Sequence, residues 1–490
     1  MVSDTHPFIL SFAKAVSVVR NPAEKSVLIR SAKTQIPVKP TTPGLEAALM
    51  SLEAGSLNQE QLVDLVLEQD GTPGLTRFYR YLQQFTNEGI LCYNLIHENG
   101  VALASLEPLN STFCYQPLEV QAERSFVLSR FAFCHQGGGE MLLETPLAPA
   151  KLVIYDWRVS ALLSVLSRPC NLLQAAEVIP GLDLPAVQAL FRLLLNLQAL
   201  SPVNENGKPE EEEDLAQWSF HELLFHTRSR IGRQNGPFGA TFPFAGKVAP
   251  LPAVKPVNYT EVLQLFKPDI DELKTNDPSL TEVIEERCSI RSHNEESPLT
   301  ARQLGEFLYR VARIRRLFSR EVLSGDHPGQ VTFELSNRPY PAGGSVYELE
   351  VYVAVRKCRD VAPGLYHYDP LEHRLGRVRD LDEKVSRLLT GAAKGAGMQA
   401  LPQVLLVIAS RFQRVSWKYE GLAYALTLKN IGALYQTMYL VATAMSLAPC
   451  ALGAGDSDLF AEATGTAYYA ETSVGEFILG SRLATSVKGE

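Results

Sequence analysis

Two short segments, Arg287-Cys288-Ser289-Ile290-Arg291 and Trp417-Lys418-Tyr419, decide how the fold and function of this chain are interpreted. The first places two cations and a hydroxyl at alternate positions, a pattern that can bind an anion or an electron-rich heterocycle. The second places an ammonium group beside a phenol, and a nearby positive charge can make a tyrosine a usable base. An almost unbroken apolar stretch from Ile431 to Leu447 lies behind this second segment.

The composition is that of an ordinary globular protein. The 490 residues are enough for about three domains, and 46% of them are hydrophobic while 20% are charged. The net charge of -8 argues against a general affinity for nucleic acid or for anionic membranes. The apolar stretch 431–447 contains Gln436 and Thr437 and is short for a membrane span, so we expect a buried core helix there.

Cysteine and histidine usage predicts neither disulfides nor a metal site. The seven cysteines are scattered and show no Cys-x-x-Cys, and the nine histidines show no spacing typical of metal ligands. The first six residues lack the basic-then-apolar pattern of a signal peptide. We therefore expect a protein of the reducing cytoplasm.

Residues 1–204 repeat one order of elements. The first copy reads as a hairpin, three helices and a strand, at Val16–Ile36, Gly44–Leu52, Asn58–Glu68, Pro73–Asn87 and Ile90–Asn94. The second reads as two strands, three helices and a strand, at Ser125–Cys134, Glu140–Glu144, Asp156–Ser167, Asn171–Val178, Leu184–Leu197 and Leu200–Val203. This order predicts two tandem winged helix-turn-helix domains, 1–110 and 111–204.

The rest of the chain reads as a connection and one larger domain. Residues 205–257 combine an acidic run, Glu210–Asp214, with a segment rich in Gly and Pro, so we expect a linker and an extended arm. Residues 258–490 mix helical and strand patterns and predict an α+β domain. Helices are expected at Leu299–Leu317 and Tyr419–Leu447, and strands at Tyr347–Val355, Gly364–Asp369, Gln403–Ser410 and Gly475–Leu479.

The predicted winged helices do not carry the charge that DNA requires. Residues 1–204 hold 14 Lys and Arg against 18 Asp and Glu, and the helix at Leu184–Leu197 has only Arg192. A winged helix can instead accept an extended peptide as an added strand, and Glu140–Pro149 reads as such an edge. The alternative is that one or both domains only support a dimer.

The first segment resembles the opening flavin motif of the nitroreductase superfamily, basic-x-Ser-x-basic. By that resemblance, Arg287 and Ser289 hold the phosphate and ribityl chain of FMN. Arg291 faces the N1–O2 edge of the flavin, where a cation stabilises the charge that reduction creates. Without the other motifs, the same residues would also fit a solvated charged loop.

Three further segments match the same family. Ala342, Gly343 and Gly344 resemble its second flavin segment, where glycines let the backbone approach a flat ring. Gly453 and Ala454 are the candidates for a backbone N–H against flavin N5, and Arg482 would complete the phosphate site. Members of the superfamily form dimers whose flavin contacts come from both chains, so we expect a homodimer with FMN at the interface.

The second segment resembles the Lys-Tyr signature of SagB-type azoline dehydrogenases, which modify ribosomally made peptides. Tyr435–Tyr439 and Ala448–Cys450 resemble the cyanobactin oxidases in particular. Three positions depart from the wider family: Ala342 stands where Ser is usual, Asn430 where Asp is common, and Ala433 where His is common. The resemblance implies that an azoline-containing precursor peptide, bound in part through its leader, is the substrate.

The implied reaction explains the pair Lys418 and Tyr419. Aromatising a thiazoline, or an oxazoline, removes a proton from the ring and passes a hydride to the flavin, with O2 as the expected final acceptor. We assign Tyr419 as the base and Lys418 as its electrostatic partner, and the reverse assignment stays open. Because adjacent residues do not face the same way on a regular helix, both reach one substrate only where the segment is irregular or lies at a helix start.

Two other functions remain open. One is an NAD(P)H-dependent nitro or quinone reductase. Such reductases lack the Lys-Tyr pair and the N-terminal repeat, and the presence of both in this chain argues against this function. The other is a non-catalytic peptide-binding scaffold with a vestigial flavin fold. A Rossmann site is not expected, because no complete Gly-x-Gly-x-x-Gly occurs.

Overall fold

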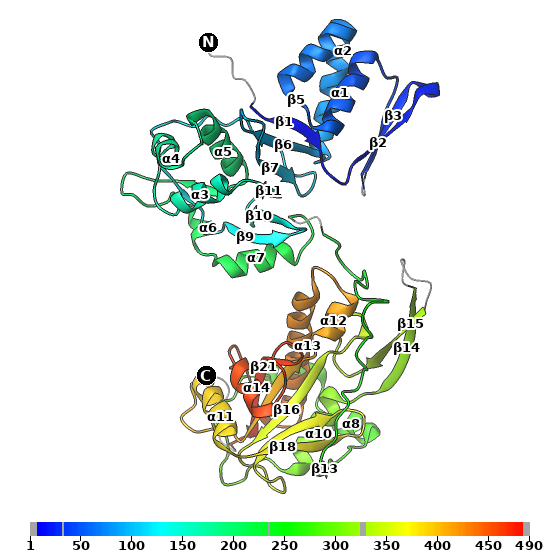
Figure 1. The fold of residues 1–490 in the computed structure, drawn as a ribbon. Coiled ribbons are helices and arrows are strands. Elements are labelled where there is room, and N and C mark those ends of the chain that lie inside the picture. The colour runs from blue at the N-terminus through cyan, green and yellow to red at the C-terminus, as the bar shows by residue number, and fades with distance from the viewer. Residues whose placement is uncertain (1–6, 32–33, 234–235, 324–329, 484–490) are drawn as a thin grey trace. The chain divides into compact units, whose positions relative to one another are not determined.

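The computed structural model describes residues 7–31, 34–233, 236–323 and 330–483. The chain divides into two compact units, 1–236 and 237–490. Each mixes helices and strands, as the predicted α+β class requires (Figure 1).

The first unit begins with the elements of the predicted first copy. They are β1 (Ile9–Phe12), β2 (Ser17–Asn21), η1 (Pro22–Glu24), β3 (Ser26–Arg30), β4 (Gln35–Val38), α1 (Pro43–Ala54), β5 (Leu57–Asn58), α2 (Gln59–Asn87), β6 (Leu91–Ile96) and β7 (Ala102–Pro108). Asn58 and Gln61 form a capping box at the start of α2. The two predicted helices after Asn58 are one element with a break at Gly71, whose φ of 66° is not helical.

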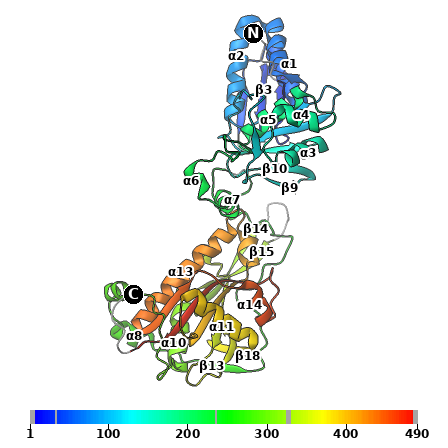
Figure 2. The same ribbon diagram turned by 90° about the vertical axis from the view of Figure 1, so that its left-hand side faces the viewer.

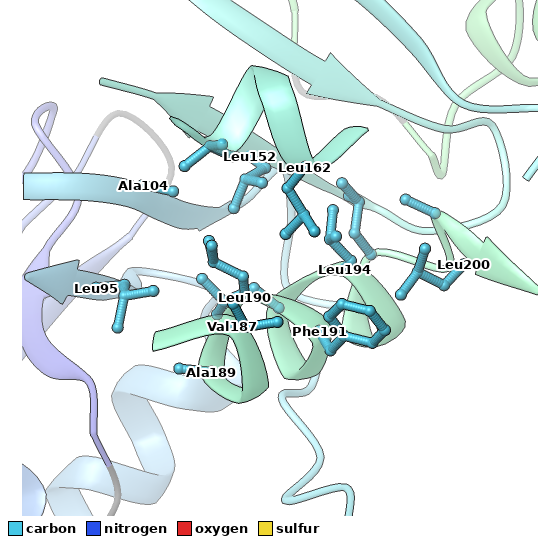
Figure 3. Packing of buried hydrophobic residues seen from close by; sticks show 14 of the residues in the cluster. Leu95, Ala104, Leu152, Leu162, Val187, Ala189, Leu190, Phe191, Leu194 and Leu200 are labelled. Atoms are coloured by element: carbon cyan, nitrogen blue, oxygen red, sulfur yellow. The ribbon is translucent and has the colours of Figure 1, made fainter. Parts of the chain in front are cut away.

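The second copy follows in the same unit. Its elements are β8 (Phe126–Leu128), β9 (Phe133–Gly137), β10 (Glu140–Glu144), β11 (Ala150–Ile154), α3 (Trp157–Val165), α4 (Leu172–Val178), α5 (Leu184–Asn196) and β12 (Leu200–Pro202). Apolar side chains of α5, among them Leu190 and Leu194, pack with Leu152 of β11 and Leu162 of α3 in one buried cluster (Figure 3).

The two copies share one sheet. Its strand order is β5-β1-β6-β7-β11-β10-β9, and β7 of the first copy pairs with β11 of the second. The predicted boundary near residue 110 therefore falls within a single compact unit. The predicted free edge at Glu140–Pro149 is wrong, because β10 lies between β9 and β11 and its hydrogen-bonding groups are paired on both sides. The edge strand on this side of the sheet is β9.

The predicted linker also contains structure. Residues Glu213–Ala216 form α6 and Phe220–Arg228 form α7. Arg130, next to β8, donates to Glu211 Oε1 at 2.9 Å and to the carbonyl of Trp218 at 2.7 Å. These contacts fasten the segment to the first unit, so the acidic run caps a folded module instead of joining two modules.

The second unit is built around a seven-stranded antiparallel sheet of order β13-β18-β17-β16-β19-β21-β20. The strands are β13 (Val262–Gln264), β16 (Leu349–Val355), β17 (Gly364–Asp369), β18 (Arg374–Asp380), β19 (Val404–Ser410), β20 (Leu447–Leu452) and β21 (Thr472–Ser481). A separate hairpin pairs β14 (Arg316–Leu323) with β15 (Gln330–Asn337).

Helices cover both faces of this sheet (Figure 2). One core contains residues of α10 (Ala301–Ala312) and α13 (Ala423–Ala444), and the other contains residues of α11 (Glu383–Ala396) and α14 (Ser457–Thr464). The remaining helical elements are α8 (Ile270–Asn276), α9 (Leu280–Glu286), η2 (Gly343–Ser345) and α12 (Gln413–Lys418).

Two predicted helices are shorter than expected. The pattern at Leu299–Leu317 ends as a helix at Ala312, and Arg316 already begins β14. The pattern at Tyr419–Leu447 is helical only over α13, and Leu447 begins β20 after Ser446, which has a φ of 52°. The interpretation of the apolar stretch as a core helix is confirmed, since Ile431, Leu434 and Met438 are buried. In the part of the chain that the structure describes, no helix has the length and apolar character needed to cross a membrane.

Candidate active site

The predicted catalytic pair lies where a helix ends. Lys418 is the last residue of α12, and Tyr419 after it is extended, with φ -115° and ψ 135°. Both side chains reach the turn at Gly344: Lys418 Nζ donates to the Gly344 carbonyl at 3.1 Å. A Cβ atom on Gly344 would lie 2.4 Å from Lys418 Nζ and 2.3 Å from Tyr419 Oη. The irregular backbone that the pair requires is therefore present.

A fully buried arginine fixes α12. Arg414 has 0% exposure, and its guanidinium donates to three backbone carbonyls. They belong to Val346 at 2.7 Å, Leu251 at 2.5 Å and Glu334 at 2.9 Å. Burial lowers the pKa of Arg414 to about 9. Arg414 lies three residues before Trp417 in the sequence, and nothing in the sequence indicates this role.

The extended arm holds the same helix from the other side. Trp417 Nε1 donates to the Val248 carbonyl at 2.8 Å, and the Trp417 ring stacks on Phe333 with centroids 4.9 Å apart. The Phe242 N–H donates to the Lys418 carbonyl at 3.1 Å. Phe242 and Val248 of the segment predicted as an extended arm therefore contact α12 and the residues at its end.

The surroundings shift the pKa values of Lys418 and Tyr419 in opposite directions. Burial, together with the positive charge of Arg320, lowers the pKa of Lys418. Burial raises the pKa of Tyr419. The expected effect of the ammonium group, a lower phenol pKa, is therefore not what this environment produces. Burial therefore favours the neutral form of both side chains, the free amine of Lys418 and the phenol of Tyr419.

The predicted glycine segment lies against α13. The Gly343 N–H donates to Asn430 Oδ1 at 3.0 Å, and a Cβ on Gly343 would approach Leu426 to 3.4 Å. Gly344 has a φ of 59°, which a glycine adopts without strain. Ala342 is half-buried and packs on the core beneath the turn.

The predicted phosphate-binding residues lie further along α13. Ser289 Oγ and Tyr439 Oη are 2.8 Å apart, and the Arg287 guanidinium lies 5.2 Å from the centroid of the Tyr439 ring. The Ile290 N–H donates to the Pro449 carbonyl of β20 at 2.8 Å. Arg291 is exposed.

The last candidates follow β20 and β21, the last two strands of the chain. Gly453 and Ala454 come directly after β20 and are exposed, and a Cβ on Gly453 would meet nothing within 4 Å. Arg482 comes directly after β21. The Asn294 N–H donates to the Ser481 carbonyl at 3.0 Å, so the structure brings Arg482 to the segment that contains Arg291.

The candidates thus form two groups along one helix. Lys418, Tyr419 and the glycine turn adjoin Asn430, whereas Arg287 and Ser289 adjoin Tyr439, nine residues later or about 13 Å along the helix axis. Guanidinium groups and a hydroxyl suit a phosphate, and glycines without Cβ atoms suit a flat ring. The residues present therefore fit FMN.

Sequence reasoning missed one acidic residue beside this region. Glu476 of β21 is 8% exposed, and its carboxylate occupies the space that a Cβ on Gly455 would need. Burial raises the pKa of Glu476 to about 7. The signal was available, because a glutamate interrupts an otherwise apolar strand at 474–479.

Three sequence families match this chain. The family described as cyanobactin oxidase ThcOx matches residues 126–235, the ThcOx helix-turn-helix domain matches 4–116, and the nitroreductase family matches 284–480. The first of these ends just before residue 237, where the second compact unit begins. It therefore includes α6 and α7, as the contacts of Arg130 imply.

Individual relatives agree with these matches. A nitroreductase homologue of Methanocaldococcus jannaschii is 30% identical over 194 residues, which are 40% of this chain and 85% of that protein. The microcin B17-processing protein McbC of Escherichia coli is 30% identical over 133 residues, 25% of this chain and 45% of McbC. Among solved structures, a chain of the E. coli microcin synthetase McbBCD complex with truncated pro-MccB17 is 20% identical, with a TM-score of 0.33, covering 53% of this chain and 91% of that one.

The nitroreductase family match, 284–480, includes both groups of the site and ends before Arg482. The matches to the N-terminal unit cover the shared sheet and both copies of the helical repeat. The chain therefore belongs to the nitroreductase family of oxidoreductases and carries the N-terminal modules that characterise the cyanobactin oxidases.

Proposed function

We propose that this protein is an FMN-dependent oxidase that converts thiazoline rings, and oxazoline rings as a second substrate class, to thiazoles and oxazoles in a ribosomally made precursor peptide. O2 is the proposed electron acceptor. The observation that carries the proposal is the convergence of Lys418 Nζ and Tyr419 Oη on the Gly344 turn. The relationship to a microcin-processing protein supports a peptide substrate.

The two catalytic residues divide the chemistry. Aromatisation removes one proton from the ring and one hydride from the neighbouring carbon, and bound FMN supplies the hydride acceptor. Lys418 is the better candidate for the proton acceptor, because burial lowers the pKa of its amine and so favours the free base. The raised pKa of Tyr419 keeps its hydroxyl protonated, so it can donate a hydrogen bond to the substrate. We therefore assign Lys418 as the base, the reverse of the first expectation from sequence.

The cofactor would be held by both groups of residues. Arg287, Ser289 and Arg482 would bind the phosphate and ribityl chain, and Arg291 would lie at the N1–O2 edge. The glycine-rich backbone, at Ala342, Gly343, Gly344, Gly453 and Ala454, would contact the ring system.

A homodimer with FMN at its interface is part of the proposal. Apolar side chains on α9 and α13 support it, because they are exposed on neighbouring helices. Leu280 is 66% exposed, Ile284 50% and Leu428 42%. Exposed apolar side chains on neighbouring helices are typical of protein–protein contacts. Sedimentation analysis with and without FMN tests this part.

The precursor peptide would dock on the N-terminal unit. The edge strand β9 presents the exposed residues Cys134, His135 and Gln136, and an extended leader could pair with it. This replaces the edge that the sequence indicated at Glu140–Pro149.

The decisive experiment uses a thiazoline-containing peptide incubated in air with the protein and FMN alone. Mass spectrometry should show a loss of two hydrogens per ring, and Lys418→Ala and Tyr419→Phe should abolish or strongly slow that loss. An unchanged mass with flavin bound would sink self-sufficient azoline oxidation.

The second candidate function is an NAD(P)H-dependent reductase, which the nitroreductase homologue of M. jannaschii favours. Rapid bleaching of the bound flavin by NAD(P)H would select the reductase. Slow bleaching together with turnover of the peptide would select the oxidase.

A further inference from the structure

A buried carboxylate is tied to the glycine turn through one side chain. Glu348 has 0% exposure, and its two oxygens accept hydrogen bonds from Asn430 Nδ2 at 2.9 and 3.2 Å. The other end of the same amide, Asn430 Oδ1, accepts the N–H of Gly343 at 3.0 Å. Because both ends of the Asn430 amide are used, its orientation is fixed and the carboxylate determines where Gly343 lies.

The same turn accepts a hydrogen bond from Lys418, the proposed base. The Gly344 carbonyl, one residue after Gly343, accepts the bond from Lys418 Nζ at 3.1 Å. The direction of that carbonyl depends on the turn, because Gly344 has a φ of 59°. A continuous path of hydrogen bonds therefore leads from Glu348 through Asn430 and the turn to Lys418.

The charges around Glu348 do not explain why a carboxylate is buried there. Among the residues that the structure describes, Glu348 forms no ion pair, although the guanidinium groups of Arg338 and Arg414 lie near enough to act on it electrostatically. The Thr427 hydroxyl of α13 faces it as well. A buried carboxylate that is hydrogen-bonded to a neutral amide costs more than an apolar side chain of the same size. Its presence is better explained by the geometry that it imposes.

We propose that Glu348 and Asn430 are positioning residues for Lys418. By fixing the Gly343-Gly344 turn, they hold the amine at the place from which it reaches the substrate ring. The proposal rests on the proposed function in one respect, the role of Lys418 as the base. The positioning itself can be measured without turnover.

The measurement is the pH dependence of Lys418 acetylation by acetic anhydride in the FMN-loaded protein, followed by peptide mass spectrometry. Burial lowers the pKa of Lys418 from its ordinary value of 10.5, so its labelling midpoint should lie below that value. Asn430→Ala releases the turn, and the midpoint should rise toward 10.5. Lys255, which is paired with Glu471 at 2.6 Å, is the internal reference, because general loosening would expose it too.

The oxidation rate provides the second readout. A displacement of about 1 Å at a catalytic group can cost about 100-fold. We expect Asn430→Ala to lower kcat by about 10-fold to 100-fold while KM changes by less than about 3-fold. Thr437→Val on the same helix is the control, because the Thr437 hydroxyl donates only to the Ala433 carbonyl.

Variants of Glu348 separate hydrogen bonding from charge. Glu348→Gln keeps an oxygen that can accept from Asn430, so it should retain the wild-type labelling midpoint and most of the rate. Glu348→Leu removes the acceptor and should behave like Asn430→Ala. Equal losses in the Gln and Leu variants would overturn the positioning role, since charge alone would then matter.

If Asn430→Ala does not fold, a second variant whose effect depends on pH tests the same role. Asn430→Asp keeps an acceptor for Gly343 but places a second carboxyl beside Glu348. The pair can share one proton at low pH and must repel when both are ionised. Turnover should approach wild type at low pH and diverge as the pH rises. A constant difference across the pH range would contradict the proposal.

The two hypotheses can fail separately. If the wild-type protein oxidises no azoline peptide, the proposed function fails, but the labelling midpoints still measure the positioning. If the peptide is oxidised and neither the midpoint nor kcat responds to Asn430→Ala, the positioning role is wrong and the proposed function stands.

Discussion

The two ends of α13 hold their candidate residues in different ways. Near its start, the turn at Gly344 and the helix end at Lys418 are fastened by buried groups, among them Arg414 and Asn430. Toward its end, Ser289 contacts Tyr439, while Arg291 and the backbone at 453–454 are exposed. The first region is shaped by the fold itself, and the second presents donors at the surface. Substitutions in the first should therefore change folding and rate, and those in the second should change cofactor affinity.

The largest effect is expected at Arg414. Arg414→Met would leave the carbonyls of Leu251, Glu334 and Val346 without their donor in a buried site. We expect the free energy of unfolding to fall by about 3 to 5 kcal/mol, measured by urea denaturation of the C-terminal transition. Arg387, exposed on α11, is the control, and Arg387→Met should change it by less than about 0.5 kcal/mol. Equal stability of the two variants would show that Arg414 does not fix α12.

The next effect concerns pH and Glu476. Burial raises its pKa from 4.5 to about 7 in the folded state. Its contribution to stability is fully present below pH 4.5 and is lost as the pH rises to about 7, because the unfolded chain ionises first. A shift of this size corresponds to about 3 kcal/mol. Glu476→Gln should flatten the curve of unfolding free energy against pH in this window, whereas parallel curves for the two proteins would rule out the raised pKa.

A smaller effect separates the two regions directly. Arg287→Ala should weaken FMN binding about 10-fold to 100-fold, since a charge-assisted bond contributes about 1.5 to 3 kcal/mol. Lys418→Ala should leave FMN affinity within about 3-fold while it abolishes azoline oxidation. Fluorescence titration of FMN into both apoproteins measures the difference. If Lys418→Ala loses FMN as strongly as Arg287→Ala, the division between the two regions is wrong.

The sequence predicted local patterns well and long-range pairings poorly. The strands at 349–355 and 404–410 are predicted from their apolar runs, and the strand at 364–369 is predicted although it contains His367 and Asp369. The sheet that joins β7 to β11 was missed, since pairing between distant strands leaves no local signal. The hairpin that begins at Arg316 is not predicted from the sequence, because the helical pattern before it continues to Leu317.

The same limit applies to the site. The Lys418-Tyr419 motif can be identified from the sequence, and so can the requirement for an irregular backbone at these two residues. That both side chains meet Gly344 depends on a contact between residues 74 or more positions apart. Asn430 was noticed only as a departure from the family pattern, and its bond to Gly343 could not be inferred without the fold.

The smallest effect on stability compares one glycine from each region. Gly344→Ala places a Cβ at 2.3 Å from Tyr419 Oη and 2.4 Å from Lys418 Nζ, and it does so at a positive φ. Because the ends of those two side chains can move, we expect the unfolding free energy to fall by only about 1 kcal/mol. Their displacement from the turn should nevertheless lower the oxidation rate about 100-fold.

Gly453→Ala is the matched comparison, because its Cβ would meet nothing within 4 Å. It should leave both unfolding free energy and the Lys418 labelling midpoint unchanged, and any effect should fall on FMN affinity. Thermal denaturation, labelling and FMN titration of the two variants then distinguish the regions on three independent scales. If Gly344→Ala oxidises azolines at the wild-type rate, the contact of Lys418 and Tyr419 with this turn is not part of catalysis, because the added methyl group cannot occupy its place while both side chains keep theirs.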